Sequence, residues 1–156
     1  MKIEIKDVGP LKVAAVESDG TYQEIGEVLM DLFRWVLERG EKVVSYPMAF
    51  FPVGPEDGPV GGVRFEACIP VNPEAELKGG GGVKIKKLPA ATVAFAKHRG
   101  PLDEVGKTYD RIFSWAEDNG YVPEKSTREL YLTNPTQFHE KDLLTEIQVP
   151  VKAVRH

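Results

Sequence analysis

The sequence predicts an α+β domain made of two similar units, each with the order strand, helix, strand, strand. Two observations predict it: the chain repeats itself after 80 residues, and each repeat places one amphipathic helical pattern between short apolar runs. The chain has 156 residues, which suits one domain or two small fused units. With 42% hydrophobic and 28% charged residues, its composition is typical of a globular protein.

The repeat is visible when residues 10–71 are compared with residues 90–151 without a gap. Twelve of the 62 aligned positions are identical, where average residue usage would give about four. The identical pairs are Val13/Val93, Ala14/Ala94, Gly20/Gly100, Glu24/Glu104, Gly26/Gly106, Phe33/Phe113, Trp35/Trp115, Gly40/Gly120, Pro55/Pro135, Glu66/Glu146, Pro70/Pro150 and Val71/Val151. We therefore expect repeat one over about 1–71 and repeat two over about 83–153.

Each repeat opens with an apolar run, at 11–17 and at 91–97, which predicts a strand. A helix follows in each, because apolar residues recur there at three- and four-residue spacing: Ile25, Val28, Leu29, Leu32, Phe33 and Val36, then Val105, Tyr109, Ile112, Phe113 and Ala116. Gly40 and Gly120 end these helices, since glycine adopts the left-handed cap readily. Two short strands complete each unit, at about 47–52 and 63–71, and at about 127–132 and 143–151.

The remaining segments are a linker and two short strands. Residues 72–82 hold four consecutive glycines and predict a flexible connection between the repeats. A phosphate-binding loop is not expected there, because no Lys-Ser/Thr follows and residues 83–88 are typical of a strand. Residues 1–8 and 83–88 supply one further strand to each half.

Charge and composition exclude several classes of function. The net charge is −4 and no Lys/Arg stripe exists, which argues against direct binding of nucleic acid. Cys68 is the single cysteine, and no HExxH, CxxCH or Cys/His pair is present, so we expect neither a metal nor another cofactor. Without a signal peptide or an apolar run of eighteen residues, the chain is expected to be cytoplasmic and not to enter a membrane.

Strand alternation sorts the side chains onto two faces of the sheet. On the last strand, Ile147 and Val149 should lie under the helices, with Glu146 on the opposite face. Matching Leu130 and Leu132 to the helix side places the opposite-facing side chains together: Glu129, Tyr131 and Glu146, with Phe51 and Glu66 from repeat one. Aromatic groups beside acids favour a ligand surface. A solvated outer face stays the alternative, because antiparallel sheets often leave one face in water.

The second half then shows a family likeness. Residues 94–109 read AFAKHRGPLDEVGKTY, and they are followed by IFSWAEDNGY, RELYLTNP and TEIQVPV. This ordered set, together with the duplicated first half, resembles the GyrI-like small-molecule-binding superfamily, also called the AraC-type or bacterial transcription-activator effector-binding domain. The resemblance spans nearly the whole chain.

The resemblance implies two pseudo-symmetric βαββ units, with two helices on one face of the sheet and a concave ligand cleft on the other. Family members bind hydrophobic, often cationic compounds there, and an acidic residue matching Glu129 is their usual cation partner. The expected ligand-binding residues are Glu129, Glu146, Tyr131, Phe51 and Trp115. A carboxylate in an apolar cleft is costly to desolvate alone, and a lipophilic cation relieves that cost. The counterpart of Glu129 in repeat one is Ala49, which places the acidic centre nearer repeat two.

Regulators in this family fuse the domain to a helix-turn-helix unit. Because the repeats here run from about residue 10 to residue 151, we expect a stand-alone sensor or sequestering protein. Two alternatives stay open. The first is a hydrolase of strained electrophilic small molecules, in which Glu129 or Glu146 activates water and Tyr131 assists as an acid. The second is an inhibitor that acts on a protein partner. Helix-edge packing is the alternative role for Trp115.

Overall fold

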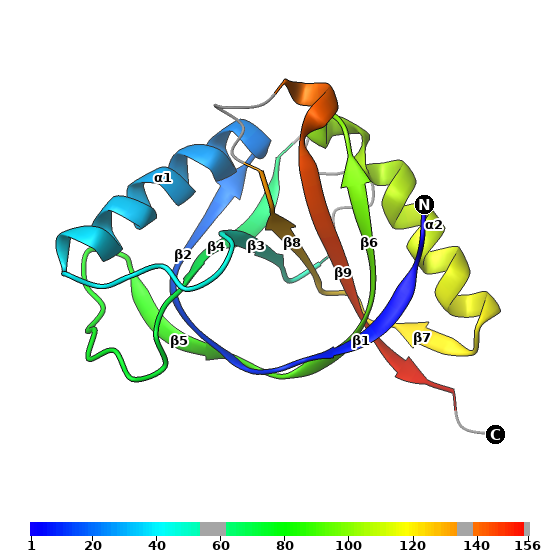
Figure 1. Ribbon diagram of the computed structural model, residues 1–156, viewed down its shortest axis with the longest axis horizontal. Helices are drawn as coiled ribbons and strands as arrows, with labels where there is room; N and C mark the ends of the chain where they lie inside the picture. The colour runs from blue at the N-terminus through cyan, green and yellow to red at the C-terminus, as the bar shows by residue number, and fades with distance from the viewer. Residues whose placement is uncertain (54–61, 134–138, 155–156) are drawn as a thin grey trace.

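A curved antiparallel sheet runs through the molecule, and both helices lie against one of its faces (Figure 1). The computed structural model describes residues 1–53, 62–133 and 139–154. Within these ranges nine strands form the sheet, in the order β1-β6-β9-β8-β3-β4-β2-β5, with β7 paired to β9 outside this path. The predicted α+β class is confirmed.

The elements follow the predicted order closely. In the first half they are β1 (Glu4–Val8), β2 (Leu11–Gly20), α1 (Tyr22–Glu38), β3 (Met48–Phe51) and β4 (Val63–Pro70). In the second half they are β5 (Lys84–Leu88), β6 (Ala91–Arg99), α2 (Val105–Asp118), β7 (Tyr121–Pro123), β8 (Thr127–Tyr131) and β9 (Leu144–Ala153). Short 3-10 turns at Leu102–Glu104 and Glu140–Asp142 precede α2 and β9. The sequence did not predict β7, which is three residues long.

The two helices bury the predicted apolar stripes. α1 buries Ile25, Leu29, Leu32 and Val36 against β2 and β4, while α2 buries Val105, Tyr109, Ile112 and Ala116 against β6 and β9. Each fully buried aliphatic side chain contributes about 1.5–3 kcal/mol of transfer free energy. Both helices are followed by a glycine in the left-handed region, Gly40 at φ 76° and Gly120 at φ 81°. Neither helix within the described ranges is long and apolar enough to cross a membrane.

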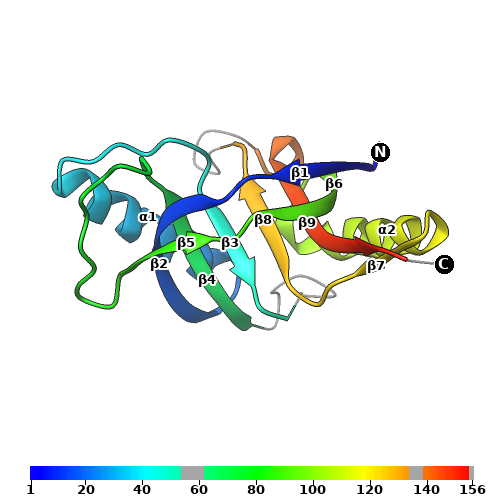
Figure 2. The same ribbon diagram turned by 90° about the horizontal axis from the view of Figure 1, so that it is seen from below.

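The short strands β1 and β5 are exchanged between the halves. β1 precedes β2 along the chain but pairs with β6, whereas β5 precedes β6 but pairs with β2. Both strands lie along the lower side of the molecule in Figure 1 and nearest the viewer in Figure 2. Each half was expected to receive one further strand. It does so from the other half.

The register shows which side chains share a face, because directly opposed residues of antiparallel strands point the same way. Across the centre of the sheet, the helix face carries a row of paired residues, in the order Ala67, Ala49, Glu129, Ile147 and Ala96. The opposite face carries Glu66, Phe50, Arg128 and Gln148 in the neighbouring row. Glu129 therefore lies on the helix face.

This register corrects the predicted grouping of side chains. Glu129, Tyr131 and Phe51 lie on the helix face, and Glu146 lies on the opposite face, where it is paired with Leu130. The prediction was wrong because Leu130 was taken to mark the helix side. The opposite face is also apolar at its centre, where Leu130 packs against a buried cluster of Val13, Ala15, Met48, Cys68 and Leu88. A leucine on β8 therefore does not distinguish the two faces.

Candidate functional site

A single carboxylate lies at the centre of the helix face, between the two helix cores. Glu129 on β8 is fully buried, with 0% of its surface exposed. Three tyrosine hydroxyls donate hydrogen bonds to it. Tyr109 and Tyr22 donate to Oε2 at 2.6 and 2.8 Å, and Tyr131 donates to Oε1 at 3.0 Å. We call Tyr22, Tyr109 and Tyr131 the tyrosine cage.

Three elements position the cage. Tyr22 is the first residue of α1 and packs against both helix cores, and Tyr109 lies in the second turn of α2. Tyr131 ends β8, two residues beyond Glu129, so strand alternation puts both side chains on one face. The Thr127 hydroxyl, 3.3 Å from the Tyr109 hydroxyl, extends the network by one group. The carboxylate is thus held by residues from both halves of the chain.

The carboxyl group of Glu129 is buried without a positively charged partner to balance its charge. Burial raises the pKa of Glu129 to about 7, and the three tyrosine hydroxyls offset part of that rise. Among the described residues, no lysine, arginine or histidine forms an ion pair with Glu129. Burial and the adjacent carboxyl raise the pKa values of Tyr22, Tyr109 and Tyr131, which keeps the three phenols neutral and able to donate.

The cage is suited to binding a cation by charge and not to binding a metal ion through several ligands. No group of three or more His, Cys, Asp or Glu side chains capable of holding a metal ion occurs in the part of the chain that the structure describes. The acceptor is one carboxylate, and its neighbours present aromatic rings and hydroxyl groups. Aromatic faces attract organic cations, especially where water is excluded.

The five predicted site residues lie in different parts of the structure. Glu129 and Tyr131 are brought together, and Phe51 is fully buried in the α1 core with Tyr131 packed against that core. Trp115 stacks on Tyr121 with ring centroids 6.2 Å apart, so it packs at the end of α2.

Glu146 lies on the far side of the sheet from the cage. Its carboxylate forms an ion pair with Lys6 at 2.8 Å and accepts a hydrogen bond from Gln148 at 2.7 Å. Glu129 and Glu146 therefore do not form the predicted acidic pair.

Sequence reasoning missed two members of the cage, Tyr22 and Tyr109. Tyr109 was counted among the apolar residues of the second helix, and Tyr22 was not assigned a role. A signal did exist at Tyr109. A buried tyrosine needs a partner for its hydroxyl, and the equivalent position in the first helix is Leu29. A tyrosine in place of leucine on a buried stripe indicates a polar group nearby.

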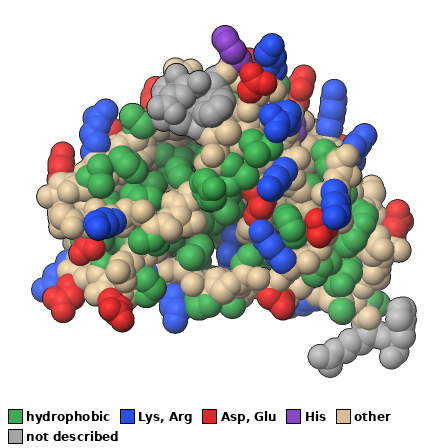
Figure 3. Space-filling model, in the orientation of Figure 1, with side chains coloured by type: hydrophobic (Ala, Val, Ile, Leu, Met, Phe, Trp, Pro, Cys, Tyr) green, Lys and Arg blue, Asp and Glu red, His purple; other side chains and the backbone are tan. Residues whose placement is uncertain are grey.

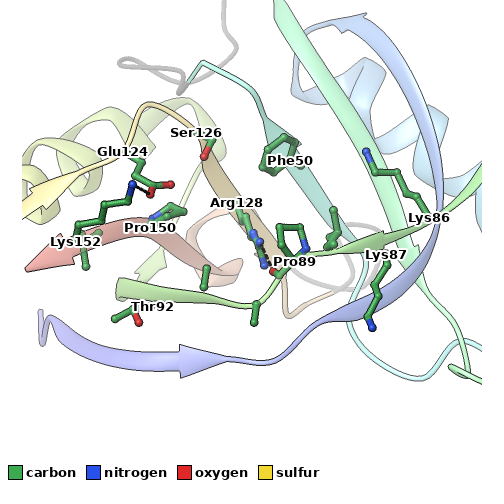
Figure 4. A pocket seen from close by; sticks show the side chains of 14 residues that line it. Phe50, Lys86, Lys87, Pro89, Thr92, Glu124, Ser126, Arg128, Pro150 and Lys152 are labelled. Atoms are coloured by element: carbon green, nitrogen blue, oxygen red, sulfur yellow. Dashed lines mark hydrogen bonds and ion pairs between the residues drawn. The ribbon is translucent and has the colours of Figure 1, made fainter.

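A second feature is a cavity of about 480 Å³ on the sheet face opposite the cage (Figure 4). Phe50 and Arg128 line it from the central strands, and Leu88, Pro89 and Pro150 are among its apolar walls. None of the five predicted site residues lines this cavity. The face away from the helices does hold a hollow, but Glu129 does not reach it.

Together, the fold and the cage define an α+β binding domain in which two helices close over one buried carboxylate. The family model described as the GyrI-like small molecule binding domain matches residues 1–152, and the chain belongs to this family. A comparison with curated proteins found no match.

Several solved structures share this fold. The crystal structure of the EcmrR C-terminal domain has a TM-score of 0.84 at 22% identity, and the match covers 98% of both chains. EcmrR in a DNA complex gives 0.85 at 23% identity, and the match covers 98% of this chain but 58% of that one. This chain thus spans little more than half the length of that EcmrR chain.

Two further structures have the same fold with lower similarity. A hydrolase encoded by lin2189 from Listeria innocua has a TM-score of 0.69 at 15% identity, over 97% of this chain and 92% of that chain. The structure of SAV2435 bound to tetraphenylphosphonium has a TM-score of 0.58 at 11% identity, over 97% and 94%.

Proposed function

We propose that the chain binds hydrophobic organic cations through Glu129, inside the tyrosine cage. One observation carries this proposal: a fully buried carboxylate accepts three neutral hydrogen bonds and has no cationic partner among the described residues. Burying an ionised carboxyl without a counter-charge costs several kcal/mol. A bound cation supplies the missing charge, and the aromatic rings replace its hydration shell.

The pKa of Glu129 determines how much of its carboxyl is ionised before a ligand binds. With a pKa of about 7, the carboxyl is partly protonated at neutral pH. A bound cation favours the ionised form, so binding expels the remaining proton. The affinity for a cation should therefore increase with pH up to about 7 and level off above it.

The route to Glu129 is indicated by the burial of the cage. Tyr109 is buried, whereas Tyr22 and Tyr131 are partly exposed. A ligand that arrives from solvent therefore meets Tyr22 and Tyr131 first and displaces their hydroxyls from the carboxylate. Binding without turnover would serve to sense or sequester the cation, and we propose this role for the domain.

The two-carboxylate hydrolase is not favoured by the geometry. In that mechanism Glu129 or Glu146 activates water and Tyr131 assists as the acid, so the version that uses Glu146 requires its carboxyl to lie beside Tyr131. Glu146 lies on the other face of the sheet and is already paired with Lys6. Only Glu129 and Tyr131 are in contact, at 3.0 Å.

Calorimetric titration with tetraphenylphosphonium tests the proposal. The matched variants are Glu129→Gln at the site, Glu117→Gln on the exposed surface of α2, and Glu146→Gln on the opposite face; each removes one negative charge. Triphenylphosphine oxide serves as the neutral analogue. We expect wild type and Glu117→Gln to bind the cation alike, and Glu129→Gln to bind it at least about tenfold more weakly.

Two outcomes would overturn this function. If Glu129→Gln binds the cation as wild type does, or if the neutral analogue binds equally well, the carboxylate is not the cation partner. If Glu146→Gln alone loses binding, the ligand lies on the opposite face. Mass spectrometry of the mixtures detects any chemical conversion of the compound, which would indicate an enzyme instead.

A further inference from the structure

Arg128, the neighbour of Glu129 on β8, is a buried cation that lacks a counter-charge. Its side chain points to the opposite face, and only 3% of the residue is exposed. Its Nη2 donates to the Pro89 carbonyl oxygen at 3.0 Å, and its Nε has no hydrogen-bond partner. Within the described residues no carboxylate forms an ion pair with it.

A buried guanidinium of this kind is stabilised by an anionic partner. A guanidinium stays charged at any pH a protein meets and carries five N–H donors in a planar fork. The backbone carbonyl of Pro89 uses one of these donors. Burial lowers the pKa of Arg128, which reflects the cost of removing its charge from water. An anion placed against the fork would remove that cost.

The guanidinium of Arg128 lies beside the cavity of about 480 Å³, which leaves room for a ligand next to it. Figure 4 shows the Arg128 side chain at the centre of the lining, next to Pro89 and between the lysines of β5 on one side and Lys152 on the other. Four basic residues line the cavity, namely Lys86, Lys87, Arg128 and Lys152, against one acidic residue, Glu124. The chain as a whole carries a net charge of −4, so the positive lining runs against the overall charge.

Two of these lysines already have partners. Lys86 contacts the Glu66 carboxylate at 2.7 Å, and Lys152 lies 3.7 Å from Glu124 at the exposed rim. An exposed pair at that distance is worth little, so Lys152 is free to turn toward a ligand. Lys87 lies between Lys86 and Leu88 on β5, so strand alternation turns its side chain to the other side of the strand, and Figure 4 shows it directed away from Arg128. The cationic group that remains for a ligand is Arg128, with Lys152 at the edge.

The rest of the lining fixes the chemical class of the ligand. Phe50, Leu88, Pro89 and Pro150 supply apolar surface, and Thr92 and Ser126 carry hydroxyl groups. A volume of this size suits a small organic molecule. We propose that the cavity binds a small organic oxyanion, a carboxylate or phosphate on an apolar body, whose oxygens pair with the fork of Arg128. This site is separate from the cage, and the proposal does not depend on the function of Glu129.

Titration with phenyl phosphate and with benzoate tests this second site, with benzyl alcohol as the neutral analogue. The variant Arg128→Gln removes the fork, and Arg111→Gln removes an equal charge from the exposed surface of α2. We expect wild type and Arg111→Gln to bind at least one of the two anions equally well. Arg128→Gln should bind it at least about tenfold more weakly, as expected for the loss of a charge-assisted bidentate pair.

A second measurement on wild type covers the case in which Arg128→Gln fails to fold. In ¹⁵N spectra, the Nε–H signal of Arg128 should shift on addition of the anion and stay in place with benzyl alcohol. The proposal is overturned if neither anion binds wild type, if Arg128→Gln binds as tightly as wild type, or if the Arg128 signal does not respond. In each of those cases Arg128 serves only to hold the Pro89 carbonyl.

Discussion

The strands β3 and β8 lie side by side at the centre of the sheet and occupy equivalent positions in the two repeats of the sequence. A shift of 80 residues matches the four residues of β3 with four of β8, pairing Met48 with Arg128, Ala49 with Glu129, Phe50 with Leu130 and Phe51 with Tyr131. β3 is apolar throughout. β8 carries two adjacent charged residues that point to opposite faces.

The comparison separates what the fold requires from what the sites require. β3 shows that this position in the sheet accepts methionine and alanine, both with 0–1% exposure. Glu129 and Arg128 are both buried, and they lose hydration without an ion-pair partner among the described residues. Buried charged residues reduce stability, and the fold does not require them at these positions. Such residues are typical of binding sites. On the surface, Figure 3 shows charged side chains more densely over the half that holds α2.

The largest effect is expected when β3 is made acidic like β8. Ala49 is fully buried and directly opposite Glu129, so Ala49→Glu places a second carboxylate within about 5 Å of the first. We expect the free energy of unfolding at pH 8 to fall by about 3–5 kcal/mol relative to Ala49→Gln, which has the same size and no charge. Urea denaturation measures the difference. Equal stability of the two variants at pH 8 would contradict a low-dielectric, closed cage.

The next largest effect is a dependence of stability on pH, which arises from Glu129 on β8 and has no equivalent on β3. The pKa of Glu129 is about 7 in the folded protein and about 4.5 in the unfolded chain. The native state therefore holds more protons than the unfolded chain between these values, so its stability falls as pH rises from about 4.5 to about 7 and changes little above that. Relative to Glu129→Gln, wild type should lose about 3 kcal/mol between pH 4 and pH 8. A constant difference across that range would show that Glu129 titrates normally.

A smaller effect is expected at the shortest hydrogen bond of the cage. Tyr109→Phe removes the donor that lies 2.6 Å from Glu129 and should lower the free energy of unfolding at pH 8 by about 2 kcal/mol. Tyr121→Phe is the control, because the Tyr121 ring is stacked on Trp115 and its hydroxyl makes no hydrogen bond to another described residue. The same loss in both variants would mean that the hydroxyl of Tyr109 has no special role.

The smallest effect is expected when β8 is made apolar like β3. Arg128→Met copies Met48 and removes a buried charge that lacks an ion-pair partner among the described residues. In a buffer without phosphate or carboxylates, we expect the free energy of unfolding to rise by about 1 kcal/mol. Thermal and urea unfolding both report it. A loss of stability would show that the hydrogen bond to Pro89 matters more to the fold than the comparison implies.

Most of the fold could be predicted from the sequence because its signals are local. The helical stripes, the glycines after each helix and the apolar runs all depend on neighbouring residues. The face of β8 could not be predicted in the same way. Alternation shows that Glu129 and Leu130 point apart, but both faces of the central sheet are buried, so burial of Leu130 does not tell which face meets the helices.

The site was predictable only in part for a related reason. Glu129 and Tyr131 lie two residues apart on one strand, so their proximity follows from the strand itself. Tyr22 reaches the carboxylate from 107 residues away along the chain. Glu146 was predicted to lie beside Glu129, because it repeats Glu66 and falls within a family motif. In the structure the strand register places it on the opposite face, where it pairs with Lys6. Contacts that depend on long-range register are not visible in local patterns.

The exchanged strands β1 and β5 have a consequence for how the chain folds. Each edge strand completes the sheet of the half to which it does not belong in sequence, so neither half can assemble all its backbone pairs alone. The halves should therefore unfold in one cooperative transition despite their internal likeness. Pairing Glu4 with Phe95 closes a long loop, which makes slow folding the expectation. A protein nicked in the glycine-rich segment Gly79–Gly82 should stay associated, because strands from each fragment remain hydrogen-bonded within the other's sheet.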